Sequence, residues 1–228
     1  MNIKHHLDEA TLVSYTAGAM SQSMALVVAS HISMCPVCQE RVQNTQKIGG
    51  MILESLKPVA INDDTLSKLL LRIDQELQSA DPEPQAVYDL VKDAHKKHSN
   101  ANVPAPLSDF IGHSFDTLDW KCIVPGIYYH DLPCDTEHAG VSRLLRIAPG
   151  KEMLLHSHDG NELTLILRGS ISDEIGRFTV GDVADLDNEI EHQPLVDSAE
   201  DCICLVATDA PLKFRTLLGK IVQPITGC

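Results

Sequence analysis

Hydrophobic residues in the first third of the chain recur at spacings of three and four, which is the period of an amphipathic helix. The pattern predicts four helices: one from Asp8 to Gly18, one that follows Ser21 and reaches His31, one that begins at Pro36, and one over 65–78. Serine and aspartate are favoured N-caps, and proline is favoured in a first helical turn. Residues 1–80 are therefore expected to form a small all-α, four-helix domain.

The fourth of these helices has the clearest division between apolar and charged faces. It follows Asp63 or Asp64, either of which is a suitable N-cap. One face carries an apolar stripe made of Leu66, Leu69, Leu70, Ile73 and Leu77. Such a stripe can pack on the other three helices or dock on a partner protein, and periodicity alone favours packing within the domain.

The pattern changes after the fourth helix. Prolines at both ends of 81–108 enclose a polar stretch that could hold a short helix over 85–97, and this composition predicts a linker. From residue 109 onward the apolar residues form short β-rich runs, separated by glycine and proline, at 142–147, 163–167 and 202–206. Residues 109–228 are therefore expected to form an all-β sandwich or barrel, which gives an α+β chain of two domains.

Composition narrows the function classes. The 228 residues carry a formal net charge of -14, and 20 of the 32 acidic residues lie in 109–228. An acidic chain is poorly suited to direct binding of nucleic acid or of an anionic membrane, because both require a basic surface. We predict no membrane-spanning segment, and acidic residues follow the N-terminus where a signal peptide would be apolar, so a cytoplasmic location is expected. Seven cysteines, an odd number, then indicate thiols or metal ligands in place of a disulfide framework.

The first candidate metal site lies at the end of the second predicted helix. His31 and Cys35 are one helical turn apart, and Cys38 follows Pro36, where a new helix would fold the two thiols toward each other. Two thiolates and two imidazoles suit tetrahedral Zn²⁺, and the fourth ligand would come from His5 or His6. A redox dithiol is less favoured because the chain lacks a βαβ context, and simple burial of the cysteines is the other alternative.

The second candidate site lies in the β-rich half. His156 and His158 alternate along a predicted strand and so share a face, and a turn at 159–161 brings Glu162 back toward them. These side chains suit a divalent first-row transition metal, with a further ligand expected from a later strand. Isolated histidines on an exposed strand are the simpler alternative.

The spacing His31-x-x-x-Cys35-x-x-Cys38 with an upstream histidine resembles the zinc-binding anti-sigma signature, and nearly the whole chain resembles the ChrR family. That resemblance implies His6 as the fourth zinc ligand. It also implies a zinc-bound helical domain that wraps an extracytoplasmic-function sigma factor, which makes the apolar stripe of the fourth helix a candidate for partner contact. In this family the second domain responds to oxidative stress such as singlet oxygen.

The segment from Gly150 to Gly169 is similar to the first cupin motif at every signature position. Resemblance to the second cupin motif implies His192 as a fourth ligand beside His156, His158 and Glu162, and a cupin fold, the double-stranded β-helix or jelly-roll barrel. Asp187, Glu189 and Val196 replace the usual Pro, Gly and Asn, which affects the expected shape of the loop. The metal is expected to be zinc or another divalent transition metal.

We therefore expect an anti-sigma factor with three parts: a zinc-binding helical domain over 1–80, a linker over 81–108 and a cupin over 109–228. No enzymatic activity is expected, although a metal-dependent cupin oxygenase with a helical accessory domain is the alternative. A third hypothesis is a redox switch in which oxidation of Cys35 and Cys38 expels zinc before the sigma factor leaves. Cys202 and Cys204 share one face of a predicted strand, and we expect them to be buried without a sensing role.

Overall fold

The structure is a computed structural model that describes residues 2–62, 64–79, 103–134, 140–158, 160–188, 190–210 and 212–214. It divides into two compact units. The first combines residues 1–47 with 102–228, and the second spans 48–101. Inside the first unit the N-terminal helices pack directly against the β-structure. The division into modules at 1–80 and 109–228 remains a prediction.

The four helices expected from the periodicity are present. They are α1 (Glu9–Thr16), α2 (Gln22–Met34), α3 (Pro36–Ser55) and α4 (Thr65–Ser79). The side chain of Asp8 accepts a hydrogen bond from the backbone N–H of Thr11 at 2.6 Å and so caps α1. The hydroxyl of Ser21 caps α2 in the same way. The possible helix over 85–97 lies outside the described residues.

A further short helix, α6 (Ala105–Ile111), stands where the sequence predicted the end of a linker. Pro104 occupies its N-cap and Pro106 its first turn, positions where a missing N–H costs nothing. Leu107 is fully buried against the sheet. The prolines therefore start a helix here that packs on the β-structure.

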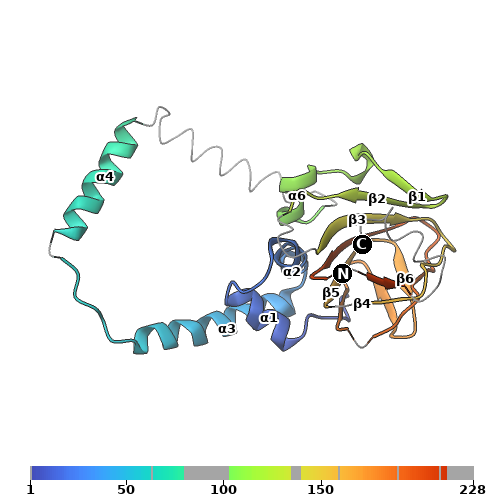
Figure 1. Cartoon of the computed structure of the whole chain (residues 1–228), viewed down its shortest axis with the longest axis horizontal. Helices are drawn as coiled ribbons and strands as arrows, with labels where there is room; N and C mark the ends of the chain where they lie inside the picture. The colour runs from blue at the N-terminus through green and yellow to red at the C-terminus, as the bar shows by residue number, and fades with distance from the viewer. Residues whose placement is uncertain are drawn as a thin grey trace. The chain divides into compact units, whose positions relative to one another are not determined.

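The β-structure is antiparallel in every described pairing (Figure 1). The largest sheet has the order β1-β2-β3-β10-β5-β8, and two smaller sheets have the orders β7-β6-β9 and β11-β4. The strands are β1 (Lys121–Val124), β2 (Ile127–Asp131), β3 (Val141–Ile147), β4 (His156–His158), β5 (Glu162–Arg168), β6 (Ser170–Ser172), β7 (Arg177–Thr179), β8 (Val183–Leu186), β9 (Leu195–Val196), β10 (Cys202–Thr208) and β11 (Leu212–Phe214). The three β-rich runs expected from the sequence are β3, β5 and β10.

Strands β5 and β10 are buried on both faces. Their side chains alternate, so Leu163, Leu165 and Leu205 point to the outer face, whereas Ile166 and Cys204 point into the interior between the sheets. Cys202 lies on the same inner face as Cys204, and both are buried as expected. Burial on both faces explains why these strands read as continuous apolar runs.

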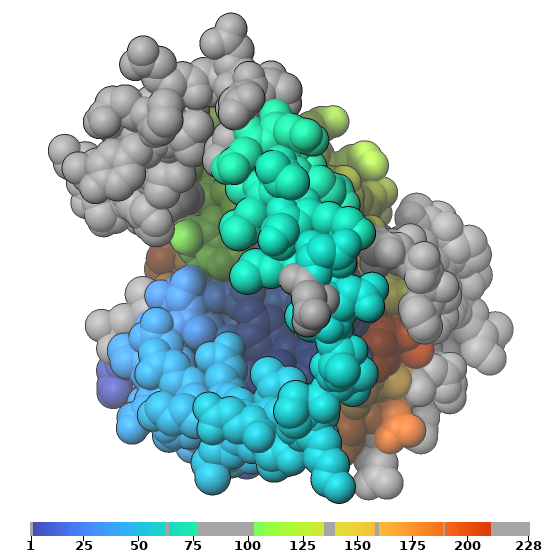
Figure 2. Space-filling view, turned by 90° about the vertical axis from the view of Figure 1, so that its left-hand side faces the viewer, coloured from blue at the N-terminus to red at the C-terminus, as the bar shows by residue number. Residues whose placement is uncertain are grey.

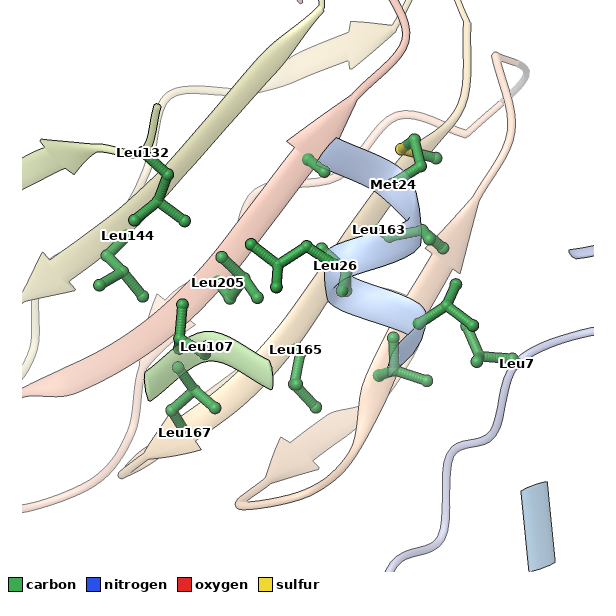
Figure 3. Close-up of a cluster of buried hydrophobic side chains, with 14 of the residues drawn as sticks. Leu7, Met24, Leu26, Leu107, Leu132, Leu144, Leu163, Leu165, Leu167 and Leu205 are labelled. Carbon is green, nitrogen blue, oxygen red and sulfur yellow. The ribbon is translucent and has the colours of Figure 1, made fainter. Parts of the chain in front are cut away.

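Helix α2 covers the outer face of this sheet, with α6 beside it (Figure 3). Its Leu26, Val27 and Val28 join Leu165 and Leu205 in one continuous apolar cluster. Among the described residues, the buried apolar side chains of α1 and α2 therefore belong to the same core as the outer face of the sheet. No helix of the described residues is both long enough and apolar enough to cross a membrane.

The second unit presents apolar side chains to solvent. Figure 2 draws α4 in teal. Leu66, Leu69 and Ile73 of this helix, three residues of the predicted stripe, are exposed. The end of α3 is similar, since Met51 and Leu53 are both about 70% exposed. Exposed apolar residues in such a run form a surface that is available for contact.

The shared core gives a stability prediction. Leu165→Ala should lower the free energy of unfolding by about 2–5 kcal/mol, because it leaves a cavity between β5 and α2. Leu195→Ala in β9, where the leucine is 37% exposed, should cost less than about 1 kcal/mol. Urea denaturation followed by circular dichroism measures both. Equal losses would contradict the proposed packing of the sheet against the helix.

Candidate metal centres

The helical metal cluster brings together all four residues that the sequence singled out. His6 lies in the segment before α1, His31 lies in the last turn of α2, Cys35 follows that helix directly, and Cys38 lies in the first turn of α3. One ligand atom from each lies within 4.8 Å of the other three. His31 and both cysteines are buried, and His6 is half-buried.

The distances in this cluster suit tetrahedral coordination. The Sγ of Cys35 lies 3.3 Å from the Nδ1 of His6, and the Sγ of Cys38 lies 3.6 Å from the same nitrogen and 3.3 Å from the Nε2 of His31. Zinc bonds of about 2.0–2.3 Å in tetrahedral geometry place neighbouring donor atoms about 3.5 Å apart. Two thiolates also balance the charge of the ion, so the donor set and its spacing both fit Zn²⁺.

The structure also separates the two neighbouring histidines. The ring of His6 faces the cysteines, whereas the ring of His5 lies against Phe178 with ring centroids 4.3 Å apart. Consecutive side chains of an extended segment point to opposite sides, which explains the difference. The residues alone left this choice open, and the geometry points to His6.

Burial sets the protonation of two members of this cluster, His31 and Cys38, in the absence of metal. Burial lowers the pKa of His31 from 6.5 to about 4, so its imidazole is neutral at pH 7. Its Nδ1–H donates to the carbonyl of Gly181 at 3.0 Å, which leaves the Nε2 lone pair facing Cys38. Burial also raises the pKa of Cys38 to about 11, and a bound cation would reverse that shift by favouring the thiolate.

The second cluster lies inside the β-structure. His156 begins β4, Glu162 begins β5, and His192 follows β8 and forms an isolated β-bridge with His156. Their ligand atoms lie within 4.8 Å of one another, and all three residues are buried. The backbone of His158 belongs to β4, but its side chain lies outside the described residues.

The two imidazoles of this cluster point their acceptor nitrogens at each other. The Nδ1–H of His156 donates to the carbonyl of Leu154 at 2.7 Å, and the Nδ1–H of His192 donates to the carboxylate of Asp173 at 3.0 Å. Each Nε2 then carries a lone pair, and the two Nε2 atoms are 3.2 Å apart. Two lone pairs at that distance repel unless a cation lies between them, so this arrangement fits a divalent metal ion.

Sequence reasoning missed Asp173. Its Oδ1 accepts from the backbone N–H of Ile175 and of Gly176, and its Oδ2 accepts from the Nδ1–H of His192. One buried carboxylate therefore joins a tight turn to a candidate metal ligand. A carboxylate behind a ligating histidine fixes the tautomer that leaves Nε2 as the acceptor. An aspartate followed by glycine three residues later is a turn signal, but nothing local to Asp173 indicates that His192 lies beside it.

A cavity of about 100 Å³ adjoins the second cluster. Aliphatic side chains such as Ile147, Ile171 and Val206 line it, together with Cys204. The hydrogen bond with Cys202 and burial both raise the pKa of the Cys204 thiol, which keeps it protonated and weakly nucleophilic. The cavity is smaller than the 300 Å³ or so at which pockets for organic ligands begin.

The fold and the two clusters define a class: a cupin whose outer sheet face carries helices with a His/Cys cluster that could hold a metal ion. Residues 109–211 match the family model described as the ChrR cupin-like domain. Over 224 residues the chain is 37% identical to the anti-sigma-E factor ChrR of Cereibacter sphaeroides, and the match covers 98% of both chains. The chain therefore belongs to the ChrR family of anti-sigma factors.

A solved structure agrees with this assignment. The anti-sigma ChrR in the crystal structure of its complex with SigE, from Rhodobacter sphaeroides, superposes with a TM-score of 0.74 at 34% identity. The match covers 91% of this chain and 99% of that chain. The predicted fold class, an N-terminal helical region followed by an antiparallel cupin, is confirmed.

The role of Asp173 gives a prediction for the cupin centre. In Asp173→Asn the amide oxygen can still accept from the turn, but the amide N–H₂ then faces His192 and favours the tautomer that protonates Nε2. Metal affinity at this centre should fall by about 10–100-fold without loss of the fold. Competition with a chelator measures the affinity, and Asp119→Asn, an exposed surface change, is the control. Unchanged affinity would show that Asp173 serves the turn alone.

Proposed function

We propose that this chain sequesters an extracytoplasmic-function sigma factor through its N-terminal helices and that its cupin adjusts the strength of this binding. The whole-length match to an anti-sigma factor carries the proposal. The related ChrR was crystallised with SigE, a sigma factor, and the match spans both the helices and the cupin. Since sigma factors act on RNA polymerase, the interaction belongs in the cytoplasm.

The ion in the helical cluster is zinc in this proposal, held by His6, His31, Cys35 and Cys38. The members of this cluster come from the segment before α1, from α2 and the residue that follows it, and from α3, in which Cys38 and Val42 are buried. A metal that binds only the folded state stabilises that state by its binding free energy. Zinc therefore sets the relative positions of the segment before α1, of α2 and of the first turn of α3.

The apolar stripe of α4 is the candidate contact surface for the sigma factor. Leu66, Leu69 and Ile73 are exposed and lie on one face of the helix. An amphipathic helix of this kind binds by laying its apolar face into a groove on the partner. The helices carry little net charge compared with the cupin, so apolar contact and shape dominate this interface.

The cupin centre is proposed to sense oxidative stress such as singlet oxygen, with zinc or another divalent transition metal held by His156, His158, Glu162 and His192. Assignment to an anti-sigma family supports a non-enzymatic role. The oxygenase alternative has less support, because the cavity beside the metal ligands holds only about 100 Å³. We infer that the centre responds to small oxidants and does not bind an organic substrate.

The stripe of α4 gives a test of sigma binding. Leu69→Asp places a charge on the proposed contact face and should weaken sigma binding at least about tenfold. Leu71→Asp is a matched control, because Leu71 is also exposed on the same helix, at 60% against 52% for Leu69, but lies off the stripe. Calorimetric titration with the extracytoplasmic-function sigma factor of the source organism measures both. Equal effects of the two changes would remove the stripe from the interface.

The division of labour between the two metal centres gives a second test. Cys38→Ser should remove about one zinc ion per chain and abolish sigma binding, because serine does not supply a thiolate to the cluster. His156→Ala should leave sigma binding intact but blunt the transcriptional response to singlet oxygen. Metal analysis, sigma pull-down and a sigma-dependent reporter measure these outcomes. If both variants lose sigma binding alike, the two-module proposal is wrong.

A further inference from the structure

The segment before α1 lies along strand β8 of the cupin. The carbonyl of His5 accepts from the backbone N–H of Val183 at 3.4 Å, and the N–H of Asp8 donates to the carboxylate of Asp185 at 3.0 Å. Strand β8 is the edge of the six-stranded sheet in the described residues. The segment that carries His6 is thus attached to the cupin at both of its ends.

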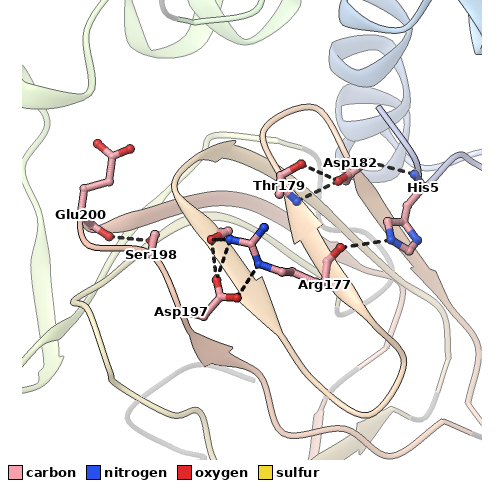
Figure 4. Close-up of polar contacts among 8 residues, drawn as sticks. His5, Arg177, Thr179, Asp182, Asp197, Ser198 and Glu200 are labelled. Atoms are coloured by element: carbon pink, nitrogen blue, oxygen red, sulfur yellow. Dashed lines mark hydrogen bonds and ion pairs between the residues drawn. The ribbon is translucent and has the colours of Figure 1, made fainter. Parts of the chain in front are cut away.

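Asp182, which lies just before β8, is the centre of this attachment (Figure 4). Its Oδ1 accepts from the backbone N–H of Lys4 at 2.6 Å and of His5 at 2.9 Å. Its Oδ2 accepts from the backbone N–H and the hydroxyl of Thr179, both at 2.8 Å. The carboxylate is fully buried and joins the N-terminal segment to the β7–β8 turn. Burial alone would raise the pKa of Asp182, but these donors together hold it below its ordinary value.

The contacts of His5 extend the same attachment. Its ring lies on Phe178, and its Nε2–H donates to the carbonyl of Arg177 at 3.2 Å. The next residue, His6, points the opposite way into the metal cluster. Fixing His5 on the cupin therefore fixes the backbone from which His6 reaches the cysteines.

The residue beside Asp182 supports a second ligand. The carbonyl of Gly181 accepts from the Nδ1–H of His31, on the other side of the cluster. Two consecutive cupin residues thus contact the helical cluster: Gly181 binds His31 directly, and Asp182 binds the backbone of the two residues before His6. Strand β8 continues from this turn to Ala184, which lines the cupin cavity, and to Leu186, which pairs with Glu162.

We propose that the Gly181–Asp182 turn of the cupin forms the outer shell of the helical zinc site, with Asp182 as the residue that positions His6. The inference rests on the proposed zinc site and adds that retention of this metal depends on the cupin. Movement of the turn would displace His6 and His31 together and lower the affinity of the site for the ion. Outer-shell partners typically contribute about 10–100-fold to metal affinity.

The test removes one hydrogen bond from the attachment and leaves every ligand in place. Lys4→Pro deletes the N–H that donates to Asp182, whereas Lys4→Ala removes only the exposed side chain and keeps that N–H. Each full-length chain is loaded with Co²⁺, whose thiolate charge-transfer absorption reports the Cys35/Cys38 site and not the cupin centre. EDTA then withdraws the ion, and the decay of the absorption gives its dissociation rate.

We expect Lys4→Pro to release Co²⁺ about tenfold faster than the unsubstituted chain and Lys4→Ala to release it at the unsubstituted rate. Asp182→Asn, which removes half of the acceptor capacity, should match Lys4→Pro, and Thr179→Val, which removes one donor on the cupin side, is its control. Fluorescence of the single tryptophan, Trp120, verifies that the cupin stays folded.

Two further results separate the possible failures. Hydrogen exchange at residues 5–8 shows whether Lys4→Pro has freed the segment. Faster exchange with an unchanged rate of Co²⁺ release in both Lys4→Pro and Asp182→Asn overturns the inference and leaves the zinc site standing. Absence of the thiolate absorption in the unsubstituted chain removes the zinc site itself, and the inference with it.

Discussion

Burial of strands β5 and β10 on both faces is the constraint on which the rest of this structure depends. Their inner faces form the cupin interior around the candidate metal ligands, and their outer faces pack against α2. Neither face is stable in water alone, since the outer face presents a row of branched aliphatic side chains and the inner face presents Ile166, Cys204 and Val206. Helix α2, whose last turn carries His31, therefore packs on the outer face of β5 and β10, and β5 also carries Glu162 into the second cluster.

The two metal clusters follow one chemical rule in different surroundings. In each, the Nδ1–H of a histidine donates to a fixed oxygen, the Gly181 carbonyl for His31 and the Asp173 carboxylate for His192, so that Nε2 faces the other ligands. The helical cluster adds thiols, which suit a closed structural zinc site, whereas the cupin cluster adds a carboxylate beside a small cavity. The first set of donor atoms suits a structural metal site, and the second leaves space beside the ligands for a small reactant.

Most residues of the two clusters could be identified from the sequence because they lie close together in the chain. His31, Cys35 and Cys38 are joined by local helix geometry, and His156 and Glu162 by one turn between strands. The outer-shell residues were not readable in this way. Asp173 lies 19 residues from His192, and Gly181 lies 150 residues from His31, so only the packing of the chain brings these pairs together.

The sequence by itself determined the four N-terminal helices, the three main strands and the candidate ligands that lie close together in the chain, because periodicity, caps and ligand spacing are local properties. Tertiary structure alone decided that α2 lies on the cupin sheet and that α6 replaces the end of the expected linker. It also decided that His6 faces the cysteines while His5 faces Phe178. These outcomes depend on which segments, far apart in the sequence, pack together and exclude water from their contact. No local sequence pattern contains that information.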